Sequence, residues 1–349
     1  LPAVATCMGL GLFAFSILGG VVAVRFSKRR IIITVQGCTA VVMGMVAVLS
    51  LTGTIELWHV GVASFAMGAG SAFFYPAYSA YLPEVLPTEQ LLAANGLEGA
   101  LRPSLGYGLG PARGGIVVGL FFPAFGAAIV AGSYLVAFVI TLFLSHRDEP
   151  VRGTSPEERA SIWGDLRAGV SYVSRTRWLL WTLIFGSSLA LIIQGPIEVL
   201  LPFLTRDRFE DAEATFGFLL AAYGIGGAVG SLVVSSLKLP RRYLTFMIVC
   251  WGGGTLPLVA IGVANNLILM LGALFLVGAR AGAGVVVWGT RLQRLVPLDM
   301  IGRVASLDFF VSIAFMPVSI AIAGPLSLLV PIPTIFVIAG VIPPVLALI

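Results

Sequence analysis

Long apolar stretches recur along the whole chain and limit its fold more than any other feature. Eleven runs cover residues 1–24, 31–52, 58–82, 95–121, 124–145, 178–204, 214–236, 243–264, 266–290, 303–327 and 331–349. A helix needs about 20 apolar residues to cross the ~30 Å hydrocarbon layer of a membrane. A typical soluble domain has about 25% charged residues, whereas this chain has 11%. The sequence therefore predicts an all-α membrane protein with about eleven transmembrane helices.

Basic residues are concentrated on one side of these predicted helices. Of the 21 lysines and arginines, 16 lie in four clusters, at 25–30, 147–177, 238–242 and 291–303. Because loops rich in lysine and arginine stay in the cytoplasm, we expect a multi-pass protein of the inner (plasma) membrane with residues 146–177 in the cytoplasm. The net charge of +5 comes from short clusters between apolar runs, so it does not indicate a nucleic-acid partner.

The longest polar segment, residues 146–177, divides the chain. It holds six arginines, and the sequence Ser155-Pro156-Glu157-Glu158 is typical of a helix start. Apolar residues then recur at helical spacing, which predicts an amphipathic helix on the membrane lipid, with a plain solvated linker as the alternative. We therefore expect an N-terminal half at 1–145, a cytoplasmic linker at 146–177 and a C-terminal half at 178–349.

The two halves match each other at a constant offset of 210 positions. The matched pairs include Lys28 with Lys238, Pro87 with Pro297, and Glu98 with Asp308. The shared basic loop lies on the same side in both halves, so the halves point the same way, as in one class of transporter. The run at 178–204 has no counterpart at this offset. We therefore expect that a first helix is missing, that the last is truncated, and that each complete half has six helices.

The loop after the first run resembles a motif of the major facilitator superfamily. Gly20, Arg25, Lys28, Arg29 and Arg30 are similar to the pattern G-x-x-x-D-R-x-G-R-R-R between helices 2 and 3 of that superfamily. The resemblance implies a cytoplasmic gate loop that latches two pseudo-symmetric six-helix halves. The residue at position 24 is valine instead of aspartate, and it can accept no hydrogen bond, which puts the latch in doubt.

A second motif lies in the fourth run and is similar to the antiporter pattern G-x-x-x-G-P-x-x-G-G of helix 5. The matching residues are Gly106, Gly110, Pro111, Gly114 and Gly115. Glycines four apart allow helices to approach closely and proline bends a helix, so ordinary packing is the alternative. Segments 73–97 and 292–304 also resemble the macrolide and multidrug exporters related to siderophore exporters. The resemblance covers essentially the whole chain and implies the major facilitator fold.

Charged residues inside apolar runs are the best candidates for function, because each is costly in hydrocarbon unless it is paired or hydrated. We hypothesise that Glu198 is a proton-coupling acid and that Arg113, at a similar depth, pairs with it. For Glu198 the alternative is simple exposure at the outer interface. Arg280, in the middle of its run, either binds an anionic substrate group or pairs internally.

Other polar residues are expected at the cytoplasmic ends of helices. Glu98 and Arg102 are four apart in the order that favours a helical ion pair. Asp308 takes the place of Glu98 in the second half, and we expect it to fasten the cytoplasmic gate together with Arg303.

Aromatic residues suggest a cavity for amphiphilic molecules. The candidates to line it are Tyr75, Tyr78, Tyr107 and Gln194. Packing or contact with lipid is the alternative for each one. No pattern predicts a catalytic nucleophile, a metal site, a phosphate-binding loop or a cofactor.

Together these features favour a monomeric secondary transporter that exports small amphipathic compounds, such as drugs, macrolides or siderophore-like molecules. The resemblance implies coupling to protons and alternating access. The alternative is a membrane scaffold or sensor that kept the fold but transports nothing. A membrane-embedded enzyme is a weaker third possibility, because the polar groups are few and scattered.

Overall fold

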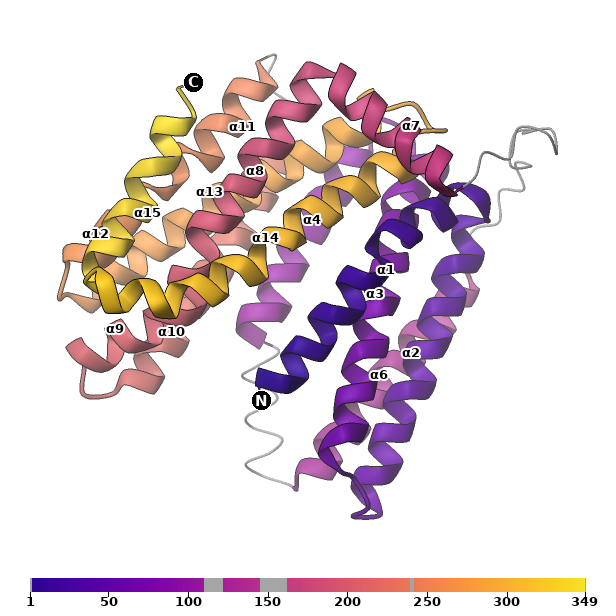
Figure 1. Cartoon of the computed structure of the whole chain (residues 1–349), viewed down its shortest axis with the longest axis horizontal. Coiled ribbons are helices and arrows are strands. Elements are labelled where there is room, and N and C mark those ends of the chain that lie inside the picture. The colour runs from indigo at the N-terminus through magenta and orange to yellow at the C-terminus, as the bar shows by residue number, and fades with distance from the viewer. Residues whose placement is uncertain (1, 110–121, 145–161, 239–241, 349) are drawn as a thin grey trace. The chain divides into compact units, whose positions relative to one another are not determined.

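A computed structural model describes residues 2–109, 122–144, 162–238 and 242–348, and every regular element in these ranges is a helix (Figure 1). The predicted all-α class is confirmed for this part of the chain. The elements are α1 (Pro2–Arg25), α2 (Lys28–Leu51), α3 (Leu57–Val85), α4 (Leu91–Pro103), the π-helix η1 (Ser104–Leu109), α6 (Pro123–Leu142), α7 (Ile162–Arg175), α8 (Arg177–Gly195), the π-helix η3 (Pro196–Leu200), α9 (Leu201–Arg208), α10 (Ala212–Ser236), α11 (Tyr243–Trp251), the 3₁₀ turn η4 (Gly253–Thr255), α12 (Leu258–Val263), α13 (Leu267–Leu295), α14 (Ile301–Leu329) and α15 (Ile332–Leu346).

Eight segments of the described ranges are long and apolar enough to cross a membrane, judged by length and composition. They are Lys28–Leu51, Leu57–Val85, Ala124–Leu142, Arg177–Arg208, Ala212–Ser236, Tyr243–Val263, Leu267–Leu295 and Ile301–Leu329. Shorter apolar helices cover Thr6–Ser16 and Ile332–Leu346. The predicted run at 95–121 continues into residues outside the described ranges. The total of eleven helices and the missing first helix therefore stay predictions.

The helices recur at the offset of the sequence repeat. The segments α3 and α13 are both 29 residues long, and their first residues, Leu57 and Leu267, are 210 positions apart. The helices α1 and α10 begin at Pro2 and Ala212, again 210 apart. The duplication visible in the sequence is therefore also a duplication of helices.

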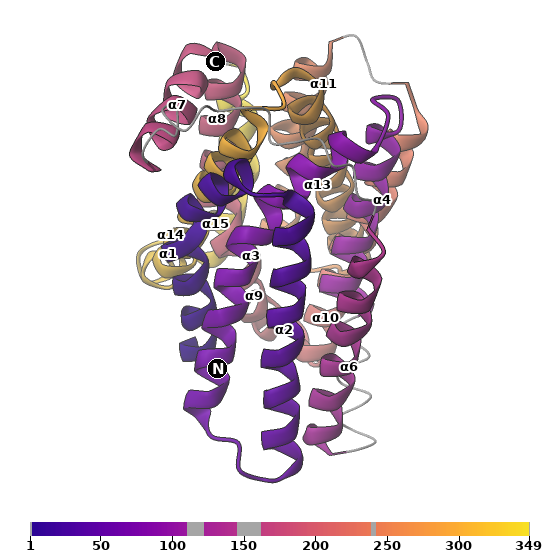
Figure 2. The ribbon, with the colours of Figure 1, turned by 90° about the vertical axis from the view of Figure 1, so that its right-hand side faces the viewer.

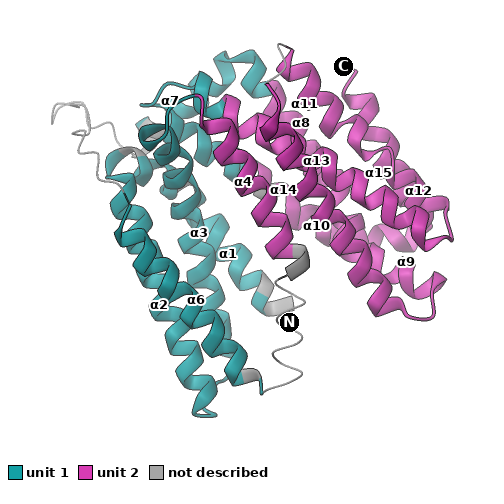
Figure 3. Ribbon diagram, turned by 180° about the vertical axis from the view of Figure 1, so that it is seen from behind, with its two compact units in different colours: residues 1–88, 113–180, 292–311 teal, residues 89–112, 181–291, 312–349 magenta. Residues whose placement is uncertain are grey.

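The chain packs into two compact units, and each combines segments from both sequence halves (Figure 3). The first unit comprises Leu1–Thr88, Arg113–Leu180 and Leu292–Val311. The second comprises Glu89–Ala112, Trp181–Arg291 and Ser312–Ile349. Packing thus groups the helices differently from their order in the chain, and the division at 146–177 stays a prediction about sequence organisation.

The first unit is built on α1, α2, α3 and α6. The helix α3 packs against both α1 and α2, and α2 packs against α6. Figure 2 shows how α2 runs into α3 through a short connection, where Gly53 has a positive φ of 72°. A small apolar cluster holds the basic-loop end together, with Ala23, Ile31, Ile32, Ala77 and Tyr81 buried.

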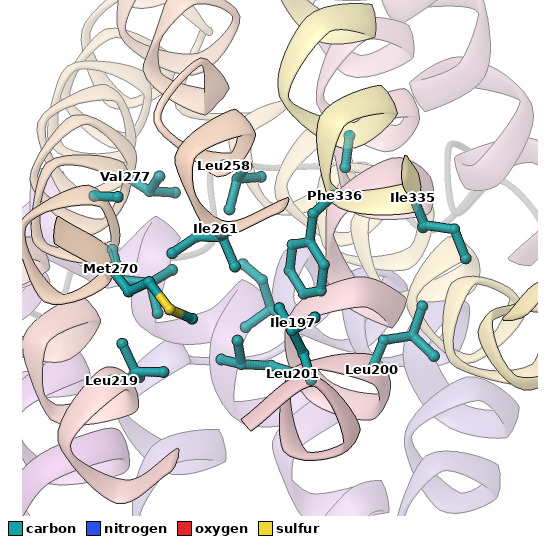
Figure 4. Close-up of a cluster of buried hydrophobic side chains, with 14 of the residues drawn as sticks. Ile197, Leu200, Leu201, Leu219, Leu258, Ile261, Met270, Val277, Ile335 and Phe336 are labelled. Carbon is teal, nitrogen blue, oxygen red and sulfur yellow. The ribbon is translucent and has the colours of Figure 1, made fainter. Parts of the chain in front are cut away.

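The second unit has an extensive apolar core among the described residues. Its buried side chains come from η3, α9, α10 and the segment from α12 to α15, and those drawn in Figure 4 point toward one another. They include Ile197, Leu201, Leu258, Met270 and Phe336. Because lipid tails are as apolar as these side chains, close van der Waals packing rather than exclusion of water holds such helices together in a membrane.

Glycines set the closest helix contacts in both units. A Cβ added to Gly68 of α3 would overlap the Met8 carbonyl of α1, and one added to Gly278 of α13 would overlap the Tyr223 carbonyl of α10. The positions 68 and 278 are again 210 apart. Equivalent glycines therefore make close backbone contacts with the neighbouring helix in both copies of the repeat.

Gly278→Ala should lower the stability of the protein by about 1–3 kcal/mol, because the added methyl group forces α10 and α13 apart. The midpoint of thermal unfolding of the purified protein in detergent measures this effect. Gly272→Ala on the same helix is the matched control, since a Cβ there meets no other atom within 4 Å. Equal stability of the two variants would contradict the close packing described for α13.

Candidate functional site

A polar pair lies at an interruption of the predicted membrane segment Arg177–Arg208. The amide nitrogen Nε2 of Gln194 donates a hydrogen bond to Oε1 of Glu198. Glu198 belongs to the π-helix η3, and both side chains are partly buried. Single π-turns inside α-helices are rare and frequent at functional sites. The structure thus brings together two of the predicted site residues, Gln194 and Glu198.

Ser319 of α14 bonds to the backbone directly before this interruption. Its hydroxyl accepts a hydrogen bond from the Gly195 amide at 2.8 Å and donates one to the Leu191 carbonyl at 2.6 Å. This amide and this carbonyl are one i→i−4 rung at the end of α8. The sequence alone does not single out Ser319, because a serine in an apolar run carries no signal of its own. Pro196 marks the interruption in the sequence.

Of the two arginines inside apolar runs that are predicted to have a functional role, Arg113 and Arg280, the structure describes only Arg280. Arg113 lies outside the described residues, so its predicted pairing with Glu198 stays a prediction. Arg280 is exposed on α13, and its side-chain stem packs against Gly254, where a Cβ would lie 2.7 Å from the Arg280 Cβ. No hydrogen bond or ion pair joins Arg280 to any other residue of the described ranges.

Aromatic side chains of the first unit form a connected cluster. The Tyr75 ring lies 4.9 Å from the Phe309 ring and contacts Phe74 edge-on, and the Tyr78 ring stacks on Phe74. Phe15 adds a contact with Phe73 at 5.8 Å. The predicted residues Tyr75 and Tyr78 therefore lie in one aromatic cluster on α3. The side chain of Tyr107 is outside the described part of the chain.

The predicted gate loop is held within the first unit. Nζ of Lys28 lies 2.6 Å from Oε1 of Glu84, at the end of α3. The Arg29 guanidinium donates hydrogen bonds to the carbonyls of Leu144 and Leu142, at 3.0 and 2.9 Å. These bonds satisfy carbonyl groups that the end of α6 leaves without an intrahelical partner. Two of the loop cations therefore hold neighbouring helix ends.

The remaining gate-loop arginines, Arg25 and Arg30, are exposed. In the second copy of the repeat, Asp308 is partly buried on α14, and Arg303 donates a hydrogen bond to the sulfur of Met300 at 3.2 Å. The proposed joint role of Asp308 and Arg303 stays a prediction.

Near the basic loops, small residues bring together helices from the two sequence halves. A Cβ on Gly20 of α1 would overlap the Ser306 side chain of α14, and a Cβ on Gly96 of α4 would overlap the Ser235 side chain of α10. Gly96 and Ser306 are 210 positions apart, so equivalent positions of α4 and α14 take part in the two contacts. Each contact lies inside one compact unit.

The helix 5 pattern is only partly described. Gly106 lies in the π-helix η1, and a Cβ there would meet no other atom within 4 Å. Gly110, Pro111, Gly114 and Gly115 lie outside the described residues. The predicted helical pair before this pattern is present, since Arg102 forms an ion pair with Glu98.

The chain matches a known protein family over nearly its whole length. The sequence profile of the transmembrane secretion effector family matches residues 3–342. The multidrug efflux pump Tap of Mycolicibacterium fortuitum is 27% identical over 330 residues, covering 91% of this chain and 78% of that protein. The enterobactin exporter EntS of Shigella boydii is 24% identical over 306 residues, covering 86% of this chain and 70% of that protein.

Solved structures show the same fold at lower identity. The major facilitator superfamily transporter FucP in the outward conformation aligns with a TM-score of 0.74 and 13% identity, covering 99% of this chain and 88% of FucP. The human organic anion transporter MFSD10 aligns with a TM-score of 0.73 and 18% identity, covering 99% of this chain and 82% of MFSD10. The predicted major facilitator fold is therefore confirmed.

Lys28→Glu should lower the stability by about 1 kcal/mol, because it replaces an ion pair by two like charges close together. The double variant Lys28→Glu/Glu84→Lys should recover most of the loss, which the midpoint of thermal unfolding in detergent measures. Arg30→Glu is the control, since Arg30 is exposed. A double variant no more stable than Lys28→Glu would argue against the pair.

Proposed function

Because the chain belongs to the transmembrane secretion effector family of the major facilitator superfamily, we propose that it exports small amphipathic compounds in exchange for protons. It is a multi-pass membrane transporter, and this superfamily consists of transporters rather than enzymes. The direction of transport, the coupling ion and the substrate class belong to the proposal.

The observation that carries the proposal is the acid at the helix interruption. Glu198 lies in a predicted membrane segment, and among the described residues its hydrogen-bond partner is a neutral amide, Gln194. A carboxylate in hydrocarbon is costly, so such a group favours taking up a proton when water or a cation no longer stabilises its charge. Alternating exposure of Glu198 to the two sides of the membrane would then move a proton with each cycle.

The substrate class rests on the aromatic cluster and on Arg280. The aromatic rings around Tyr75, edge-on to Phe74 and tilted against Phe309, offer apolar surface, which suits amphipathic molecules. Arg280 lies near the middle of the 29-residue helix α13. At 1.5 Å per residue it is about 20 Å from either end, too far for its charge to reach the membrane surface. A cation at this depth with no ion pair among the described residues supports a water-filled path and a preference for anionic substrate groups.

The named relatives agree with this class in outline. Tap is a multidrug efflux pump and EntS exports enterobactin. Identities of 24–27% support an exporter of small molecules without selecting one substrate.

Alternating access would use the contacts between the sequence halves. The close packing at Gly20 with Ser306 and at Gly96 with Ser235 occurs where the basic loops lie. Because small residues separate without leaving large unfilled gaps, such contacts suit helices that must part and close again. We place the basic loops and the linker 146–177 in the cytoplasm and the protein in the inner membrane, as a monomer.

Glu198→Gln should reduce efflux driven by an imposed pH gradient by at least about tenfold, the factor that about 1.4 kcal/mol of lost coupling represents. Proteoliposomes loaded with a fluorescent amphipathic drug measure this rate. Glu213→Gln, at an exposed acid on α10, is the matched control. Undiminished pH-driven efflux in Glu198→Gln would rule out this acid as the coupling group.

The same assay separates the proposal from its alternative. A membrane scaffold or sensor that kept the fold would bind a ligand but move none of it, with or without a pH gradient. Transport by the unaltered protein, abolished by an uncoupler, would exclude that alternative.

Arg280→Gln should weaken the export of anionic amphiphiles about tenfold, while neutral amphiphiles keep their rates, because a charge-assisted hydrogen bond contributes roughly 1.5–3 kcal/mol. Arg280→Lys is the control that keeps the positive charge. Its rate for the anionic amphiphile should fall between the rates of the unaltered protein and of Arg280→Gln. Rates for a pair of dyes that differ only in a carboxylate test this. An equal loss for both dyes would favour a structural role for Arg280.

A further inference from the structure

The last turn of α8 bonds to a side chain from a distant helix. The Gly195 amide and the Leu191 carbonyl are one rung of the helical ladder, and both bond to the Ser319 hydroxyl of α14. Ser319 is only 4% exposed, and Gly195 and Pro196 are buried. The bridge is therefore an internal part of the second unit.

The bridge lies directly before the point where the helix changes. Pro196 has no amide hydrogen, so the ladder loses its next bond there, and the π-helix η3 follows. The Ser319 hydroxyl both accepts and donates, so one side chain ties α14 to the last regular rung of α8.

The contact between the two helices leaves little free space. A Cβ on Gly195 would overlap the backbone carbonyl of Ser319 and would lie 2.9 Å from the Ala323 Cβ. The helix α14 has a proline of its own, Pro317, two residues before Ser319. Both helices are thus altered where they meet, and the hydroxyl is held in place by close backbone packing.

The bridge lies next to the acid pair. Gln194 precedes the bridged amide by one residue, and Glu198 follows it by three, within the π-turn. Around the acid, the described neighbours Ile197, Leu200 and Leu201 are apolar and buried. Ser319 is a polar side chain of another helix that bonds to the backbone directly before this turn.

We propose that Ser319 is a positioning residue for the proton site: its hydroxyl holds the interrupted turn of α8 so that Gln194 and Glu198 stay paired. Because Ser319 belongs to α14, a movement of α14 along α8 would alter the turn and with it the surroundings of the acid. This inference rests on the proposed role of Glu198 in proton coupling. It adds a residue from another helix through which substrate-induced movement reaches the acid.

The experiment compares two modes of transport in the full-length protein in proteoliposomes. One is efflux driven by a pH gradient, and the other is substrate exchange without any gradient, which needs no net proton movement. Ser319→Ala should lower the gradient-driven rate about tenfold, since it removes both hydrogen bonds that tie α14 to the last turn of α8, and should leave exchange nearly unchanged. Ser319→Thr, which keeps the hydroxyl, should retain most of the coupled rate.

Ser187→Ala is the matched control for removing a buried hydroxyl. Ser187 lies on α8 and is 7% exposed, but its hydroxyl bonds only to the Leu183 carbonyl of its own helix. Its removal should change neither transport mode. If Ser319→Ala cannot be purified as a monodisperse protein, Ser319→Cys takes its place, because it keeps the volume and bonds only weakly.

The outcomes separate this inference from the proposed function. Selective loss of gradient-driven efflux in Ser319→Ala, with recovery in Ser319→Thr, supports the positioning role. Equal loss of both modes, or unchanged coupling in Ser319→Ala while Glu198→Gln is inactive, overturns it and leaves the proposed function standing. Unchanged coupling in Glu198→Gln overturns the proposed function and this inference together.

Discussion

The structure depends on the requirement that backbone amides and carbonyls find partners inside the protein where no water reaches them. Long helices meet this requirement on their own, and their ends and interruptions need help from side chains. Arg29 supplies donors to the carbonyls at the end of α6. Arg208 does the same for α12, with bonds of 2.6–2.8 Å to the carbonyls of Ile261, Gly262 and Ala264. Ser319 bonds to an amide and a carbonyl of α8 directly before its interruption. The few polar side chains among the apolar runs are therefore used where helices stop or change course.

A second constraint is that helices in lipid associate through close van der Waals packing of matching surfaces. The contacts of Gly68 with Met8 and of Gly278 with Tyr223 bring backbones together in the two copies of the repeat. At the basic-loop end, the contact of Gly20 with Ser306 joins helices from different sequence halves. Glycines thus bring helices together inside each unit, both within one sequence half and between the two halves.

Few charged residues lie inside the apolar segments, and their partners show which of them have a structural role. Glu98 and Arg102 form a pair and so have a structural explanation. Glu198 has a neutral partner and Arg280 has none among the described residues, so neither is accounted for by ion pairing. A transporter needs such groups, because protons and anionic substrates must bind within the membrane and leave again. The proposed function assigns each of them a task.

The sequence by itself determined the class of protein, the repeat and the family. Apolar runs of membrane length predict helices because hydrophobicity is a property of each segment alone, and the offset of 210 predicted the matching bounds of α3 and α13. It also indicated Glu198 and Gln194, whose spacing of four places them on one face of a helix. Only the tertiary structure paired Lys28 with Glu84 and brought Ser319 to the α8 ladder across 124 positions of sequence. No local pattern predicts such contacts, because a serine in an apolar helix looks the same whether it bonds its own backbone, as Ser187 does, or bonds that of another helix.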